Sequence, residues 1–196
     1  MAGEAVLGAL RHVWLVLKSA GVPAAVISGI AMAAWKYVRA TNVVDLLIAV
    51  DDDQVEGLLG ELSEAAIRPK CDPPLVSLGR LSVIPLLYEP PETFADVQID
   101  LLIGKSAYHQ TALQRRLATR LPDLDVEIDV LACEDVILHK LSAGRIIDRA
   151  DAAALLRANR ERLDFGYLAR WADELGVAEG LTEAWSEAFP GEPPPG

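Results

Sequence analysis

Residues 26–48 read VISGIAMAAWKYVRATNVVDLLI, and this stretch decides how the rest of the chain is interpreted. An apolar run ends at Ser28-Gly29, an alanine-rich segment follows, and a second apolar run carries one acid, Asp45. Apolar runs next to glycine are typical of strands, and the segment between them is typical of a short helix. A carboxylate in a buried strand is costly unless it binds something, so Asp45 is the first candidate functional residue.

The composition of the chain excludes several classes of protein. Its 196 residues are 52% hydrophobic and 24% charged, which is typical of a globular chain with a sizeable core. The net charge of −11 disfavours nucleic-acid binding unless basic residues gather locally. Cys71 and Cys133 stand in no paired motif, which is typical of a reducing compartment. Because we find neither a signal peptide nor an apolar span of membrane length, we expect a cytoplasmic protein without a membrane partner.

The remaining patterns predict an α+β fold, in which a mixed sheet flanked by helices precedes a helical subdomain. Before Cys133 we expect helices over residues 4–20, 54–66 (capped by Asp53) and 106–119, and strands over 81–88, 97–103 and 126–131. Residues 67–80 are rich in proline and predict a loop with at most a short edge strand. Helices are then expected over 133–143, 147–160, 164–175 and 178–189. The predicted units are a core of residues 1–132, a helical subdomain of residues 133–190 packed on it, and a disordered tail of residues 191–196.

A second acid, Asp100, interrupts the apolar run of residues 97–103. Two carboxylates at the same level of neighbouring strands repel each other unless a cation lies between them, and Mg²⁺ prefers one or two carboxylates together with phosphate oxygens. The Ser28-Gly29 turn before a helix would bring backbone N–H groups toward phosphate. Together these parts suggest metal-assisted nucleotidyl transfer. Each also has an ordinary alternative, because strand acids often face solvent at a sheet edge and Ser-Gly turns are common.

Four segments of the chain resemble the minimal nucleotidyltransferase superfamily, and specifically its abortive-infection (AbiEii-like) toxin group. Residues 26–48 resemble the group's Gly-Gly turn, helix and Arg-x-Thr-x-Asp-x-Asp strand, and residues 97–104 resemble its strand with the third acid. Residues 133–151 and the later LDFGYLARWADELG resemble its helical segment. The resemblance implies a nucleotidyltransferase-type sheet and transfer of a nucleoside monophosphate from a nucleoside triphosphate to RNA or protein. It also implies an antitoxin-like protein partner.

The resemblance further implies roles for individual residues. Asp45 and Asp100 would hold Mg²⁺, and Asp100, which matches the third acid, would act as the base. The residues at the nucleotide would be Ser28, Gly29, Arg39, Thr41, Lys140 and Asp148. The alternatives are that Arg39 and Thr41 form an ordinary strand entrance, and that Lys140 or Arg145 forms an exposed ion pair with Asp148.

Three positions depart from the pattern of the group. Val43 stands where the first acid of the Asp-x-Asp pair is expected, Ser28 stands where a glycine is expected, and Lys36 stands where a glycine usually precedes Arg-x-Thr. Asn42 does not replace the missing acid, because it points to the opposite face of the strand from residues 43 and 45. Two hypotheses follow, an active Mg²⁺-dependent nucleotidyltransferase and a degenerate protein that binds a nucleotide or another protein. A third is that Val43 is an introduced change that disables an active enzyme.

Other titratable residues give weaker signals. The acids Asp51 to Asp53 resemble a metal cluster, but an acidic turn at a helix start is the simpler interpretation. Cys133 at a helix start could be activated, whereas the acids that follow it favour an inert thiol. His109 and His139 have no Ser or Cys at a catalytic spacing, and isolated histidines are mostly structural or solvated.

Overall fold

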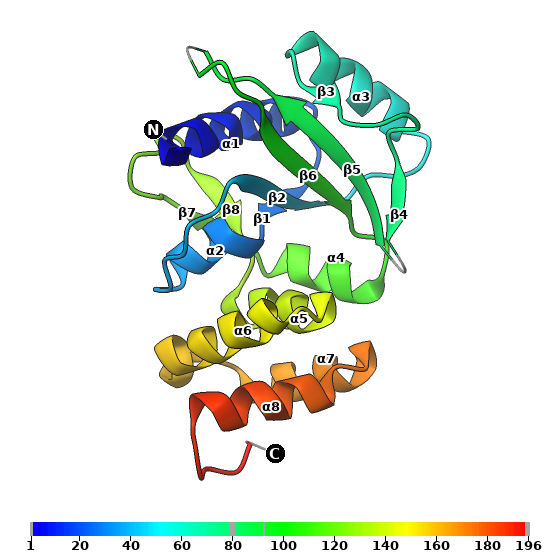
Figure 1. Cartoon of the computed structure of the whole chain (residues 1–196). Coiled ribbons are helices and arrows are strands. Elements are labelled where there is room, and N and C mark those ends of the chain that lie inside the picture. The colour runs from blue at the N-terminus through cyan, green and yellow to red at the C-terminus, as the bar shows by residue number, and fades with distance from the viewer. Residues whose placement is uncertain (1, 79–80, 92, 195–196) are drawn as a thin grey trace.

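The computed structural model describes residues 2–78, 81–91 and 93–194, and these form one mixed sheet with helices packed around it (Figure 1). Helices α5 to α8 gather at one end of the sheet, and α3 lies at the far end from them. This arrangement confirms the α+β class. Parts of the predicted loop 67–80 and of the predicted tail 191–196, namely residues 79–80 and 195–196, lie outside the described residues.

The helices come in two groups, one within the sheet region and one after it. The helices before the last strand are α1 (Ala2–Ser19), α2 (Ser28–Ala34), α3 (Val55–Glu64) and α4 (Ala107–Gln114). The later ones are α5 (Cys133–Ala143), α6 (Ile146–Asn159), the short 3-10 helix η1 (Arg160–Arg162), α7 (Phe165–Leu175) and α8 (Ala178–Ala188). These bounds lie within a few residues of the predicted ones, except at α4.

The strands form one 8-stranded sheet within the described residues, in the order β3-β5-β6-β2-β1-β8-β7, with β4 paired to β5. They are β1 (Ala24–Val26), β2 (Val43–Ile48), β3 (Arg68–Pro69), β4 (Val76–Leu78), β5 (Leu81–Tyr88), β6 (Val97–Ile103), β7 (Leu117–Thr119) and β8 (Ile128–Val130). Two pairings are parallel, β2 with β6 and β1 with β8, and the others are antiparallel. The sheet is therefore mixed, as predicted.

Residues 67–80 contain two short strands, β3 and β4, rather than at most one. Two predictions about helices were also wrong. The helix expected over 106–119 ends at Gln114, because Leu117–Thr119 pairs with β8 instead. Helix α3 is capped by Gln54 rather than by Asp53, and the Gln54 side chain accepts a hydrogen bond from the backbone N–H of Asp51. Both errors arise where contacts from a distant or neighbouring segment outweigh the local propensity.

One apolar core extends from the sheet into the helical region. It contains residues of α1, such as Leu10, of the central strands, such as Leu46 and Ile99, and of α5 to α8, such as Leu156 and Trp185. The helical end is therefore held against the strands by shared burial, and residues of α5 and α6 keep a fixed position relative to β2. Among the described residues, no helix combines the length and the apolar character needed to cross a membrane.

Candidate functional site

Strands β2 and β6 place the two strand acids side by side. The parallel pairing aligns Asp45 with Asp100 and Val43 with Gln98. Successive side chains of a strand point to opposite faces, so these four share one half-buried face of the sheet. The face opposite is buried in the core. The two carboxylates consequently stand at the same level of adjacent strands, as the sequence predicts.

Asp45 lines a pocket of about 170 Å³ between the sheet and helices α5 and α6. Its polar lining residues are Ser28, Asp45, His139, Lys140, Ser142, Arg145 and Asp148. Its apolar lining includes Ile27, Leu81, Leu102 and Val136. A site with one charged end and one apolar end can hold a ligand that carries both phosphate and a less polar group.

The Ser28-Gly29 turn at the start of α2 lies at this pocket. Ser28 has a φ of 59°, a left-handed conformation that is uncommon for residues other than glycine. A Cβ atom on Gly29 would lie 2.8 Å from the Cβ of Thr41, so a side chain at position 29 would collide with the segment that precedes β2. Gly29 is therefore needed for packing, and Ser28 is the residue of the turn that lines the pocket.

Burial raises the pKa of Asp45 to about 6. The nearby charge of Asp100 adds to this increase, whereas a hydrogen bond from Ser28 and the positive charges of Lys140 and Arg145 oppose it. A carboxylate that is costly to ionise in the absence of a ligand gains when a cation comes close. This behaviour marks Asp45 as a candidate functional residue, in a pocket that also contains positive side chains.

Helices α5 and α6 contribute a buried group of charges beside the pocket. The Lys140 ammonium lies 3.0 Å from Asp148 Oδ1 and 2.8 Å from Asp151 Oδ2, and all three side chains are buried. The alternative of an exposed ion pair is therefore wrong for Lys140 with Asp148. Arg145 differs from them, because its side chain is 67% exposed while its Nη2 lies 3.1 Å from Asp148 Oδ1.

The pairing affects how these groups titrate. Burial tends to raise the pKa of Asp148, but hydrogen bonds from Arg145 and Lys140 outweigh it, so this pKa lies below its usual value. The hydrogen bond to Asp148 raises the pKa of Arg145. Both residues stay charged at neutral pH, and Arg145 is the positive side chain that combines a place in the pocket with access to solvent.

Arg39, Thr41 and Gly29 line a different, largely apolar pocket of about 330 Å³, on the side toward α1. The Arg39 guanidinium lies 3.4 Å from Asp151, and the Thr41 hydroxyl donates a hydrogen bond to the backbone oxygen of Val43. The structure thus gathers Ser28, Lys140 and Asp148 around Asp45, and places Arg39 and Thr41 behind the turn. Their predicted contact with a nucleotide remains a hypothesis.

Three residues that the sequence did not single out for the site also lie here. Arg145 and His139 line the pocket, and the side chain of Gln98 contacts Asp100. Burial, with a smaller effect of His109, lowers the pKa of His139 to about 3, so its imidazole is neutral at physiological pH. No sequence motif marks Gln98, because its position follows from the register of β2 and β6. In the sequence, Arg145 could be identified only because it matches a polar position of the related group.

The carboxylate oxygens of the site suit at most one small cation that prefers oxygen ligands. Asp45 and Asp100 provide two aligned carboxylates, which together with phosphate oxygens match the preference of Mg²⁺. Val43, the position of a further expected acid, adds no ligand, and within the described part of the chain no group of three or more His, Cys, Asp or Glu side chains is arranged to hold a metal ion. Asp52 instead forms an ion pair with Lys105. The residues therefore fit one Mg²⁺ shared with a ligand.

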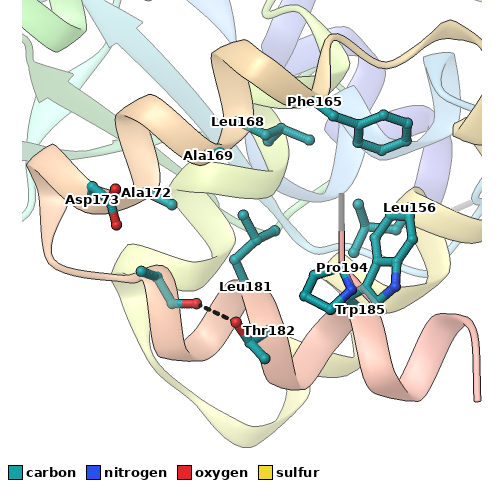
Figure 2. Close-up of a pocket in the computed structure, with 11 residues that line it drawn as sticks. Leu156, Phe165, Leu168, Ala169, Ala172, Asp173, Leu181, Thr182, Trp185 and Pro194 are labelled. Carbon is teal, nitrogen blue, oxygen red and sulfur yellow. Dashed lines mark hydrogen bonds between the residues drawn. The ribbon is translucent and has the colours of Figure 1, made fainter. Parts of the chain in front are cut away.

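A third pocket, of about 150 Å³, lies in the helical region away from the strand acids (Figure 2). Figure 2 shows Phe165 and Leu168 of α7 on one side of it and Leu181 and Trp185 of α8 on the other, with Pro194 nearby. Asp173 is the one titratable residue among those that line it. This pocket therefore has less capacity for chemistry than the one around Asp45.

The sheet, the aligned acids and the adjoining helices form a fold that is similar to that of nucleotidyltransferase-like proteins of known structure. Two solved structures are similar across nearly the whole chain. One is an antigenic nucleotidyltransferase-like protein from Paracoccidioides brasiliensis, with 17% identity over 90% of this chain and 92% of that chain and a TM-score of 0.51. The other is JHP933 from Helicobacter pylori, with 14% identity over 91% of this chain and 87% of that chain and a TM-score of 0.50.

No family model matches the chain, and no curated protein matches it. At these identities the likeness to the two structures concerns the fold. Membership of the AbiEii-like group therefore remains a hypothesis that rests on the sequence motifs.

Proposed function

We propose that the protein binds a nucleoside triphosphate in the pocket around Asp45 and transfers the nucleoside monophosphate to an acceptor on RNA or protein. The observation that carries this proposal is the placement of Asp45, in register with Asp100, in a pocket that also contains the Ser28 turn and the Arg145 guanidinium. Mg²⁺ is the expected cofactor, and when bound it would stabilise the negative charge of the phosphates. The AbiEii-like group, an antitoxin-like partner and a cytoplasmic location belong to the same proposal, because they rest on the sequence resemblance and composition.

Each residue of the pocket would contribute a distinct part of the reaction. Asp45, with Asp100 as a second candidate, would hold the cation at the phosphates. Arg145 would approach a phosphate oxygen, since its side chain is largely exposed and fixed at one edge by Asp148. Lys140 is buried beside the pocket and would contribute by keeping Asp148 and Asp151 in place. Asp100 would accept the proton of the attacking hydroxyl group.

The second candidate function is nucleotide binding without transfer. Val43 favours it, because this apolar side chain stands on the same face as Asp45 and Asp100, where a further metal-binding acid is expected. Efficient two-metal catalysis needs ligands for two ions about 4 Å apart, and a site with fewer carboxylates holds the second ion poorly. In this case the protein would act as a nucleotide-dependent or protein-binding module.

Calorimetric titration with Mg²⁺-ATP and Mg²⁺-GTP, followed by a radiolabel transfer assay, tests both candidates. We expect Arg145→Ala to weaken binding by about 10-fold or more, because a hydrogen bond to a charged group contributes about 1.5–3 kcal/mol. Arg149→Ala is the matched control, since Arg149 of α6 forms a surface ion pair with Glu183 of α8. Absence of nucleotide binding by the native chain would refute the proposal.

The Val43→Asp variant separates the two candidates. Label transfer by the native chain supports the enzyme. Transfer only by Val43→Asp, with nucleotide binding by both proteins, supports the non-catalytic binding module.

A further inference from the structure

Asp100 already has a hydrogen-bond partner within the protein. The Gln98 side-chain amide donates to both of its carboxylate oxygens, with Nε2 3.0 Å from Oδ1 and 2.9 Å from Oδ2. The Lys70 ammonium, at the end of β3, donates in turn to Gln98 Oε1 at 2.6 Å. A continuous chain of donors therefore runs from a positive charge, through an amide, to the carboxylate of Asp100.

The position of Gln98 is notable because its register partner is Val43. Val43 occupies the place where the related group has an acid, and the next strand presents an amide donor at the same level. The position where an acid is expected and the amide that donates to Asp100 thus lie side by side in the sheet. The sheet pairing brings them together although 55 positions of sequence separate 43 from 98.

The physical effect of this arrangement resembles that of a cation. A half-buried carboxylate is costly unless its oxygens receive donors or a positive charge. Lys70 polarises the Gln98 amide by donating to its oxygen, which strengthens the donation from its nitrogen to Asp100. Asp100 receives donors at both carboxylate oxygens, whereas the half-buried carboxyl of Asp45 accepts a hydrogen bond from Ser28 and lines the pocket. Asp100 therefore gains less from a metal ion than Asp45 does.

We propose that Gln98, supported by Lys70, takes the place of the second cation of a two-metal site, so that a single divalent ion binds on Asp45 and Asp100 is not a metal ligand. This inference refines the proposed nucleotide site and rests on it for the identity of the ligand. Each carboxylate oxygen has two lone pairs, so Asp100 keeps acceptor capacity for a hydroxyl group of the acceptor. Gln98 and Lys70 are therefore positioning residues for Asp100.

The test is Mn²⁺ binding to the full chain, followed by electron paramagnetic resonance, with and without a non-hydrolysable ATP analogue. For the native chain we expect one Mn²⁺ per chain. Asp45→Asn should weaken this binding by about 10-fold or more, as expected for loss of a metal ligand, whereas Asp100→Asn should leave it nearly unchanged. Gln98→Glu adds a carboxylate and removes the donor, so we expect a second Mn²⁺ in that variant.

Lys70→Met is the milder companion variant, because Lys70 is exposed and its loss should leave the fold intact. By removing the positive charge behind Gln98, it should allow weak additional Mn²⁺ binding at Asp100, where the native chain binds none. Circular dichroism melting of each variant verifies folding. The inference is overturned if Asp100→Asn loses Mn²⁺ as strongly as Asp45→Asn, or if Gln98→Glu and Lys70→Met both leave Mn²⁺ binding unchanged.

The measurement without nucleotide distinguishes a failure of this inference from a failure of the proposed function. A chain that binds Mn²⁺ as expected but fails to bind the ATP analogue retains the assignment of Asp45 and Gln98 and refutes the nucleotide site. A chain that binds the analogue but requires Asp100 for the metal refutes the inference alone.

Discussion

Lys140→Met tests the buried charges that join α5 to α6. Methionine keeps the length of the side chain and removes the ammonium that lies 3.0 Å from Asp148 and 2.8 Å from Asp151. Asp148 retains Arg145, but Asp151 is left with Arg39, at 3.4 Å, as its ion-pair partner among the described residues. Neither oxygen of Asp151 receives a well-aligned hydrogen bond from the described residues, so its charge depends on the nearby cations.

The magnitude follows from the burial of all three groups. Removing one partner of a buried ion pair destabilises a protein by about 3–5 kcal/mol, and we expect the lower end because Arg145 still pairs with Asp148. For a chain of this length, about 3 kcal/mol lowers the melting temperature by roughly 6–12 °C. The pair Arg149–Glu183 is the control, because its two side chains are 47% and 49% exposed and Arg149→Ala should cost only about 0–1 kcal/mol.

The assay is urea denaturation at neutral pH, with thermal melting as a second measurement. The double variant Lys140→Met/Asp151→Asn should recover part of the lost stability, because neutralising Asp151 removes the uncompensated charge. A free energy of unfolding for Lys140→Met within 1 kcal/mol of the native value would refute the reasoning. It would mean that water reaches Asp151 and that the group of charges is not effectively buried.

Three further predictions concern single sites. Gly29→Ala should destabilise by about 1–3 kcal/mol through the collision with Thr41, whereas Gly57→Ala, with open space in α3, should stabilise by about 0.5–1 kcal/mol; both are measured by urea denaturation. The pKa of Asp45 is about 6 in the folded chain, against an ordinary value of 3.8. The folded chain therefore binds more protons than the unfolded chain between pH 3.8 and pH 6, so the contribution of Asp45 to stability falls as the pH rises through this window. In buffer with a chelator, Asp45→Asn should therefore be more stable than the native chain at pH 8, by at most about 3 kcal/mol, with no difference below pH 3.8. Burial raises the pKa of the Cys133 thiol, so a thiol reagent should modify the exposed Cys71 rapidly in the native protein and Cys133 only after unfolding.

The sequence predicted the parts of the fold that local patterns control. The run from Val97 to Ile103 alternates in burial and was expected as a strand with those bounds. Leu81–Tyr88 was also expected as a strand with the bounds that the structure shows. The turn at Ser28-Gly29 also lies where it was expected. In these segments propensity, periodicity and turn chemistry all favour the same structure, which is the condition under which local reasoning succeeds.

The wrong predictions have a common cause, which is contact between segments that are distant in the sequence. Residues 117–119 have no strong preference that ends a helix, and they form β7 because β8 offers an unpaired edge. Lys140 was expected either at phosphate or on a solvated face, but α6 returns along α5 and buries it against two acids. Neither outcome can be read from one segment, since each depends on what a distant segment presents.

The candidate site shows the same division between local and non-local information. Asp45 and Asp100 were recognisable because an acid in an apolar run is unusual in itself, whereas Gln98 is an ordinary polar residue of a half-exposed strand face. Its meaning comes from its two neighbours in the sheet, Val43 across the strand pair and Asp100 two residues along. On the proposal above, an apolar residue at position 43 therefore does not by itself leave a defective site. The partner strand supplies an amide donor at the same level, and this amide contacts both carboxylate oxygens of Asp100.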